Sequence, residues 1–214
     1  MHWGMVIDLK LCIGCNTCVA MCKMRNGTPK GVFWNRVLIG ERGEYPTVIK
    51  ENLPVLCNHC KDAACVNVCP TGATSRREDG IVIVDSDDCV GCRYCMMACP
   101  YQMRTFLEHQ KEYYPGQELT PWERLGREIY PLEEGTVVKC NFCVERIDEA
   151  LRMGLKPGID REATPACVNA CPTKARIMGD LDDRESEVAR LIKERKGVQL
   201  HPEFGTDPSV YYLG

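Results

Sequence analysis

Short apolar runs predict two β-strands, each just upstream of a cysteine-rich segment. The first lies in the N-terminal stretch MVIDLKLCIGC, and the second is the run Gly80–Val84 ahead of CVGC. Successive side chains of a strand point to opposite faces, so each run can bury one face. The shared order of strand and cysteines indicates an internal repeat.

Apolar residues at helical intervals predict an amphipathic helix late in the chain. Its apolar positions, three or four residues apart as on one helical face, are Val144, Ile147, Leu151 and Leu155. This helix lies between two cysteines and is expected to be an insertion in their loop.

A second helix is predicted within residues 182–214. Asp182 is the expected N-cap, Glu185 follows three residues later and Gly197 stands just past the end. Val188, Leu191 and Ile192 are expected to face inward. The remaining stretch contains too many prolines and glycines for regular structure, and predicts an extended arm.

Length and composition narrow the classes of function. A chain of 214 residues can form one large or two small domains. Its 27 basic and 30 acidic residues give a net charge of −3, so no nucleic-acid partner is expected. No apolar stretch approaches the roughly 20 residues that span a bilayer, and no export signal is visible at the N-terminus. Neither a direct membrane span nor a targeting signal is therefore expected.

Sixteen cysteines form four groups of four. They are group I (Cys12, Cys15, Cys18, Cys22), group II (Cys57, Cys60, Cys65, Cys69), group III (Cys89, Cys92, Cys95, Cys99) and group IV (Cys140, Cys143, Cys167, Cys171). Proline follows the last cysteine of groups II, III and IV, whereas Lys23 follows group I. Groups I and III have the complete spacing C-x2-C-x2-C-x3-C.

This spacing is typical of ligands to [4Fe–4S] clusters. Three closely spaced thiolates wrap one cluster, and in two-cluster ferredoxins the fourth cysteine ligates the other cluster. Structural zinc instead takes two separated cysteine pairs per metal. Disulfides need an oxidising compartment, and cysteines three residues apart are poorly placed to pair. Four [4Fe–4S] clusters are therefore predicted.

The same exchange of the fourth cysteine assigns the ligands. The predicted sets are cluster 1 (Cys12, Cys15, Cys18, Cys171), cluster 2 (Cys140, Cys143, Cys167, Cys22), cluster 3 (Cys57, Cys60, Cys65, Cys99) and cluster 4 (Cys89, Cys92, Cys95, Cys69).

The order of the groups predicts an α+β fold with two nested bacterial two-cluster ferredoxin-like modules and loop-rich insertions. Residues 57–106 form the inserted module, and residues 1–56 and 107–181 form a split outer module. Residues 182–214 add the C-terminal helix and arm. The segment 101–139 is an insertion, either a surface excursion that packs its aromatic residues on the nearest module or a docking surface; these aromatics are Tyr113, Tyr114, Trp122 and Tyr130.

Basic residues near the ligands could offset the charge of the clusters, which is about −2 each with four thiolates. These are Arg93, Lys139, Arg146, Lys174 and Arg176; the alternative is that they are solvated surface residues. His59 is expected to contact backbone or solvent, because its group already has four cysteines. There is no dinucleotide fingerprint, P-loop or nucleophile elbow, so no catalytic residue is assigned and a non-catalytic electron carrier is predicted.

Over nearly its whole length the chain resembles the four-cluster iron–sulfur subunits of the complex iron–sulfur molybdoenzyme (dimethyl sulfoxide reductase) family, which serve dimethyl sulfoxide, polysulfide, thiosulfate and arsenate reductases. The phrases that carry the resemblance are MVIDLKLCIGCNTC, EYPTV, LCNHCKDAACVNVCPTGA, DDCVGCRYCMMACPY, KCNFCVERID, ACVNACPTKARIMGDLDD and PEFGTDPSVYYL. Cys92 stands where the nitrate reductase branch has a tryptophan, so the resemblance implies four complete clusters.

The resemblance also implies partners and a location. It implies a catalytic subunit that holds molybdenum or tungsten in a bis(molybdopterin guanine dinucleotide) cofactor, and often a membrane subunit that exchanges electrons with quinol. The expected site is a membrane-associated complex on the periplasmic or outer side, exported with the partner subunit; the alternative is the cytoplasm. Two other functions stay open: an iron–sulfur subunit of a hydrogenase or formate dehydrogenase complex, or a free polyferredoxin; and a zinc-stapled interaction module.

Overall fold

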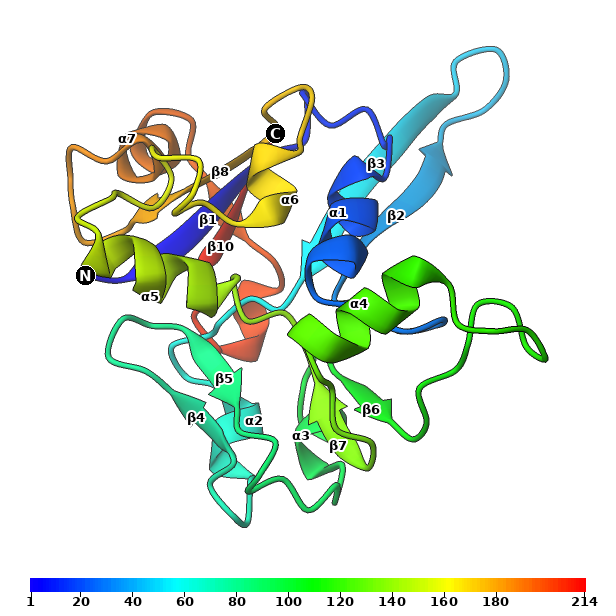
Figure 1. The fold of residues 1–214 in the computed structure, drawn as a ribbon. Coiled ribbons are helices and arrows are strands. Elements are labelled where there is room, and N and C mark those ends of the chain that lie inside the picture. The colour runs from blue at the N-terminus through cyan, green and yellow to red at the C-terminus, as the bar shows by residue number, and fades with distance from the viewer.

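The computed structural model describes residues 1–214 as short strands and short helices joined by long loops. Figure 1 shows two regions: a sheet flanked by helices in the upper part, and two small hairpins in the lower part. The predicted mixture of helix and strand is confirmed.

A four-stranded sheet joins the two ends of the chain. Its strands are ordered β8 (Arg176–Asp180), β1 (Trp3–Asp8), β10 (Val210–Leu213) and β9 (Val198–Gln199). Strand β1 is buried along its whole length and pairs antiparallel with β8 and parallel with β10. The predicted N-terminal strand is thus confirmed, and it lies beside the strand that follows group IV.

The C-terminal segment contains more regular structure than the sequence predicts. Strand β10 is a paired, buried strand, and the expectation of an arm without regular structure was wrong there. The apolar residues Val210 and Leu213 are fully buried, which explains why this short run after a proline still joins the sheet. Only the stretch between β9 and β10, with the 3-10 helix η1 (Pro202–Phe204), is irregular.

The C-terminal helix α7 (Glu187–Glu194) starts later than predicted. Its N-cap is Ser186, whose hydroxyl accepts a hydrogen bond from the Ala189 amide at 3.2 Å. Asp182 instead pairs with the N-terminal ammonium group at 3.0 Å. Val188 is fully buried against the sheet, as predicted.

The lower region is built on the predicted strand before group III. Strand β5 (Val82–Val84) pairs antiparallel with β4 (Thr74–Arg76). The one-turn helices α2 (Ala64–Asn67) and α3 (Tyr94–Met97) carry cysteines of groups II and III and pack against each other.

A long hairpin of β2 (Asn35–Arg42) and β3 (Ile49–Leu56) extends away from both regions, as Figure 1 shows. Its base is buried and its tip is exposed.

The insertion 101–139 is partly ordered into secondary structure. It contains β6 (Thr105–Leu107) paired with β7 (Thr136–Val138), and helix α4 (Pro121–Ile129). Helix α4 approaches the end of helix α1 (Thr17–Arg25) so closely that a Cβ on Gly27 would lie 2.9 Å from the Gly126 carbonyl oxygen. Tyr130 packs under the guanidinium of Arg25, 4.0 Å from its ring centroid, whereas Tyr113, Tyr114 and Trp122 keep exposed surface.

Group IV is split by the predicted helix. This helix is α5 (Val144–Arg152), on which Ile147 is fully buried, and α6 (Ala166–Asn169) follows it. Leu155 lies beyond its end, because Gly154 adopts a positive φ of 75°.

One main core runs through both regions. It includes apolar side chains from β1, β3, β10 and α5, together with Cys18, Cys22, Cys140 and Cys167. Ligand positions are therefore part of the packing that holds the fold. None of the helices has the length and apolar character needed to cross a membrane.

Candidate metal centres

None of the sixteen cysteines forms a disulfide. Six of them are buried: Cys18, Cys22, Cys95, Cys140, Cys143 and Cys167. Buried thiols that pack together without disulfides fit a metal group, because bound metal supplies the positive charge that clustered thiolates need.

A cavity in the upper region is lined by Cys22 together with three cysteines of group IV, Cys140, Cys143 and Cys167. Burial raises the pKa of the Cys22 thiol well above its usual value, and the nearby Cys167 and Cys143 raise it further. Burial likewise raises the pKa of Cys143 to about 12. The structure thus brings together the four residues predicted for cluster 2, although Cys22 is more than a hundred positions away from the others.

A second set converges in the lower region. Burial raises the pKa of Cys60 to about 12, and Cys57, Cys65 and Cys99 act in the same direction. These are the four residues predicted for cluster 3, with Cys99 contributed by group III.

The remaining two sets lie at contacts between short helices. Helix α1 carries Cys18 and packs on α6, which ends two residues before Cys171. Helix α3 carries Cys95 and packs on α2, which ends two residues before Cys69. The full ligand sets of clusters 1 and 4 stay predictions.

The four groups share one backbone feature. The residue before the second cysteine has a positive φ in every group: Gly14 (70°), His59 (44°), Gly91 (65°) and Phe142 (56°). This conformation favours glycine, yet groups II and IV use large side chains there. The rings of His59 and Phe142 lie against each other, with centroids 3.8 Å apart, and both are buried.

His59 contacts backbone, as predicted, and not solvent. Its Nδ1 accepts a hydrogen bond from the Val82 amide at 3.0 Å, and the side chain is fully buried. Burial holds the pKa of His59 well below its usual value, and the charges of Lys139 and Arg104 lower it further.

Two cysteines that precede proline have matching hydrogen bonds to sulfur. The Sγ of Cys69 accepts from the Thr74 amide at 3.3 Å, and the Sγ of Cys171 accepts from the Ala175 amide at 3.2 Å. A threonine hydroxyl also lies near each sulfur, at 3.8 Å from Cys69 and 3.6 Å from Cys171. Such bonds are one of the means by which proteins set cluster potentials.

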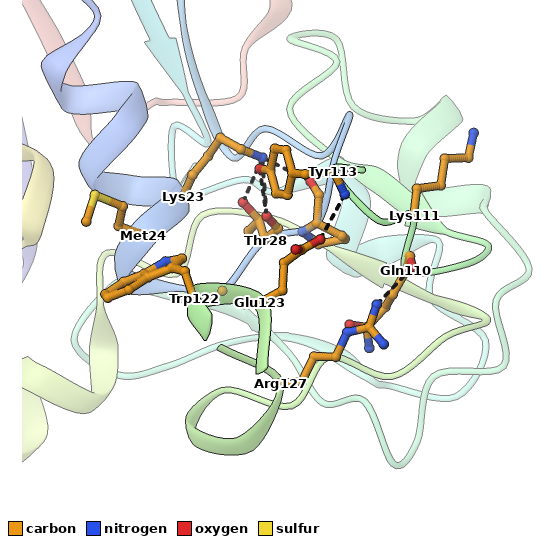
Figure 2. A pocket seen from close by; sticks show the side chains of 11 residues that line it. Lys23, Met24, Thr28, Gln110, Lys111, Tyr113, Trp122, Glu123 and Arg127 are labelled. Atoms are coloured by element: carbon orange, nitrogen blue, oxygen red, sulfur yellow. Dashed lines mark hydrogen bonds between the residues drawn. The ribbon is translucent and has the colours of Figure 1, made fainter. Parts of the chain in front are cut away.

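Lys23 stands after Cys22, where the other three groups have proline, and its side chain hydrogen-bonds to the loop that follows. Its Nζ donates to the carbonyl oxygens of Pro29 at 2.9 Å and Val32 at 2.8 Å. Figure 2 shows this side chain in a pocket between α1 and the insertion, close to Tyr113. Burial lowers the pKa of Lys23 to about 8. Its partners are structural, so we assign this pocket no chemistry.

The predicted basic residues divide into two kinds. Lys139 and Arg176 are buried, whereas Arg93 and Lys174 are exposed and Arg146 is half-buried. A third buried cation, Arg104, was not predicted from the sequence. The available signal was its position: Arg104 and Arg176 each stand five residues after a cysteine that precedes proline, in CPYQMR and CPTKAR.

Comparison with known proteins adds two kinds of match. Family models described as "4Fe-4S dicluster domain" match residues 11–73 and 48–115. A putative dimethyl sulfoxide reductase iron-sulfur subunit of Halobacterium salinarum is 43% identical over 99% of this chain and 79% of its own length. The arsenate respiratory reductase iron-sulfur subunit of Shewanella sp. strain ANA-3 is 38% identical over 100% and 96%. A subunit of the tetrathionate reductase of Salmonella typhimurium is 39% identical over 100% and 72%.

Proposed function

Because the chain belongs to the iron–sulfur electron-transfer subunits of the complex iron–sulfur molybdoenzyme family, we propose that it binds four [4Fe–4S] clusters and passes electrons through them. It is an electron-transfer subunit and not the catalytic one. Each bound cluster supplies a centre that accepts and releases one electron. The observation that carries the proposal is the cavity where Cys22 meets three cysteines of group IV.

The four clusters take the ligand sets predicted from the exchange of fourth cysteines. Support comes from the convergence of Cys22 with group IV and of Cys99 with group II. The equivalent backbone turn before the second cysteine of every group supports four similar ligand loops.

The two modules are nested. The antiparallel pairing of β1 with β8 supports a split outer module, because it joins the strand before group I to the strand after group IV. The hairpin of β4 and β5 supports an inserted module, because it connects groups II and III without residues from elsewhere.

The electrons travel between a catalytic subunit with molybdenum or tungsten on a bis-pterin cofactor and a quinol-linked membrane subunit or other redox partner. The names of the relatives, subunits of dimethyl sulfoxide, arsenate and tetrathionate reductases, support a catalytic partner. We further propose that the complex works on the periplasmic or outer side of a membrane, and that the chain is exported there with its partner.

Metal analysis of the anaerobically purified complex tests the number of clusters. About 16 iron atoms per chain, with molybdenum or tungsten in the same complex, are expected. Zinc in place of iron would refute the redox function and indicate an interaction module.

Replacement of Cys22 tests the ligand exchange. Cys22→Ser is expected to alter the electron paramagnetic resonance (EPR) signal of cluster 2, because its sulfur lies among Cys140, Cys143 and Cys167. The variants Cys12→Ser and Cys143→Ser serve as matched references for the signals of clusters 1 and 2. A Cys22→Ser spectrum that matches Cys12→Ser, with cluster 2 intact, would contradict the assignment.

A further inference from the structure

Three basic side chains are buried without an acidic partner. Arg104, Lys139 and Arg176 are 6%, 4% and 3% exposed, respectively. None of the chain's salt bridges includes them. A buried charge without an opposite charge is strongly unfavourable, so we expect a buried anion that is not a carboxylate beside these three positions.

Arg176 lies between cysteines assigned to clusters 1 and 2. Its guanidinium donates to Asn35 Oδ1 at 2.9 Å, and Asn35 in turn donates to the carbonyl oxygen of Cys18 at 3.0 Å. Asn35 also lines the cavity shared by Cys22, Cys140, Cys143 and Cys167. Burial acts to lower the pKa of Arg176, but nearby Cys167 and Cys18 raise it above its usual value. Cys18 belongs to the proposed cluster 1 and Cys167 to cluster 2.

Lys139 lies between cysteines assigned to clusters 2 and 3. Its Nζ donates to the carbonyl oxygen of Cys140 at 2.7 Å and to that of Val82. The Val82 amide donates to the Nδ1 of His59, which stands between Cys57 and Cys60 in the chain. Burial lowers the pKa of Lys139; nearby Cys57 and Cys140 raise it, and Arg104 lowers it further. Cys140 belongs to cluster 2 and Cys57 to cluster 3.

Arg104 lies between cysteines assigned to clusters 3 and 4. One guanidinium nitrogen donates to the Sγ of Cys65 at 3.0 Å, and the other donates to Thr74 Oγ1 at 3.1 Å. Thr74 in turn donates its amide to the Sγ of Cys69 at 3.3 Å. Burial acts to lower the pKa of Arg104, but nearby Cys65, Cys57 and Cys95 raise it above its usual value. Cys65 belongs to cluster 3, and Cys69 and Cys95 belong to cluster 4.

We propose that the chain places one buried cation in each interval of a linear series, in the order cluster 1, Arg176, cluster 2, Lys139, cluster 3, Arg104, cluster 4. Each is a positioning residue, because it acts on electron transfer only through the neighbouring clusters. The inference rests on the ligand sets proposed above.

The role of the cations follows from the charge balance. Each reduction adds one electron to a cluster and neither forms nor breaks a bond, so two adjacent reduced clusters repel each other more strongly. A cation between them is attracted by both and stabilises the reduced state of each. It therefore raises both reduction potentials and allows neighbouring clusters to be reduced together.

The test is a redox titration of the intact complex, followed by EPR, for Arg176→Gln, Lys139→Gln and Arg104→Gln. Each variant is expected to shift the midpoint potentials of its two flanking clusters to more negative values and to leave the other two unchanged. Arg42→Gln is the matched control, because Arg42 is an exposed residue on the projecting hairpin. The ligand variants Cys12→Ser, Cys143→Ser, Cys57→Ser and Cys92→Ser identify the four signals.

Two results would overturn the inference: potentials that match wild type in a fully loaded Gln variant, or a shift spread evenly over all four clusters. If a Gln variant binds less iron, a variant that keeps the charge is used in its place. These variants are Arg104→Lys, Arg176→Lys and Lys139→Arg. Because they keep the charge, these variants are expected to stay close to the wild-type potentials, with any small shift at the same two clusters; a shift at other clusters would reject the proposal. Failure of the proposed function is distinguishable, because the wild-type complex itself would then lack four titrating signals.

Discussion

Replacement of Tyr212 tests whether the C-terminal strand holds the two ends of the chain together. Tyr212 is 1% exposed, lies beside Ile7 in the pairing of β10 with β1, and belongs to the main core. Its hydroxyl donates to the carbonyl oxygen of Pro54 at 2.9 Å. A tyrosine hydroxyl is protonated at neutral pH and can donate this bond, and burial raises the pKa of Tyr212 further.

The expected magnitude follows from what each substitution removes. Tyr212→Phe leaves the buried carbonyl of Pro54 without its donor, which costs about 1–2 kcal/mol. Tyr212→Ala also empties the volume of the ring, and large-to-small changes of this kind cost about 3–5 kcal/mol. A loss of about 1–2 kcal/mol corresponds to a change of roughly 5- to 30-fold in the unfolding equilibrium.

The assay is the rate at which the visible absorbance of the clusters is lost on anaerobic incubation in urea, because cluster loss makes unfolding irreversible. Tyr212→Phe is expected to speed this loss by up to about 30-fold, and Tyr212→Ala by more. Tyr211→Phe is the matched control, since the hydroxyl of Tyr211 is only half-buried and accepts one bond from Gln199 at 3.2 Å. Equal rates for Tyr212→Phe, Tyr211→Phe and wild type would refute a supporting role for β10.

Two further predictions concern the contacts around the modules. Arg77 of the lower region forms two hydrogen bonds with Asp148 of α5, at 2.6 and 2.8 Å; the bonds from Arg77 lower the pKa of Asp148 from 3.8. This stabilisation is present above pH 3.8 and is lost as the pH falls through the lower pKa of Asp148 in the folded chain. The acid-induced rise in the rate of cluster loss should therefore be smaller in Asp148→Asn than in wild type. An unchanged pH profile would contradict this prediction. Thr120→Ala removes the capping box of α4 and should destabilise that helix by about 1 kcal/mol. The measurement is amide hydrogen exchange at Glu123, which should become faster. Unchanged exchange would show that the cap is not needed.

The parts that could be predicted from the sequence are those determined by local spacing. The strands before groups I and III follow from short apolar runs ahead of the cysteines, and the helix within group IV follows from apolar periodicity; the structure confirms each. The N-cap of α7 was predicted wrongly, because Asp182 fits the local pattern but pairs with the N-terminal ammonium group instead.

The parts that could not be predicted depend on long-range contacts. Strand β10 has too short an apolar run to be recognised alone, and it is stabilised by pairing with β1, which lies about two hundred residues earlier. Arg104 resembles any other arginine beside a loop until the fold places it 3.0 Å from the Sγ of Cys65. The sequence does contain the matching offset of Arg104 and Arg176 from their cysteines, but offset alone does not indicate burial.

The position of the ligands in the core couples cluster binding to folding. Cys18, Cys22, Cys140 and Cys167 are members of the main apolar cluster, and the cavity beside three of them lies between segments within residues 22–56 and residues 140–167. A group bound in that cavity is attached to all of these segments at once, so its binding free energy adds to the stability of the folded chain. The same attachment keeps Lys139 and Arg176 next to anions, without which their burial is unfavourable. Cluster binding and the burial of these cations therefore stabilise each other.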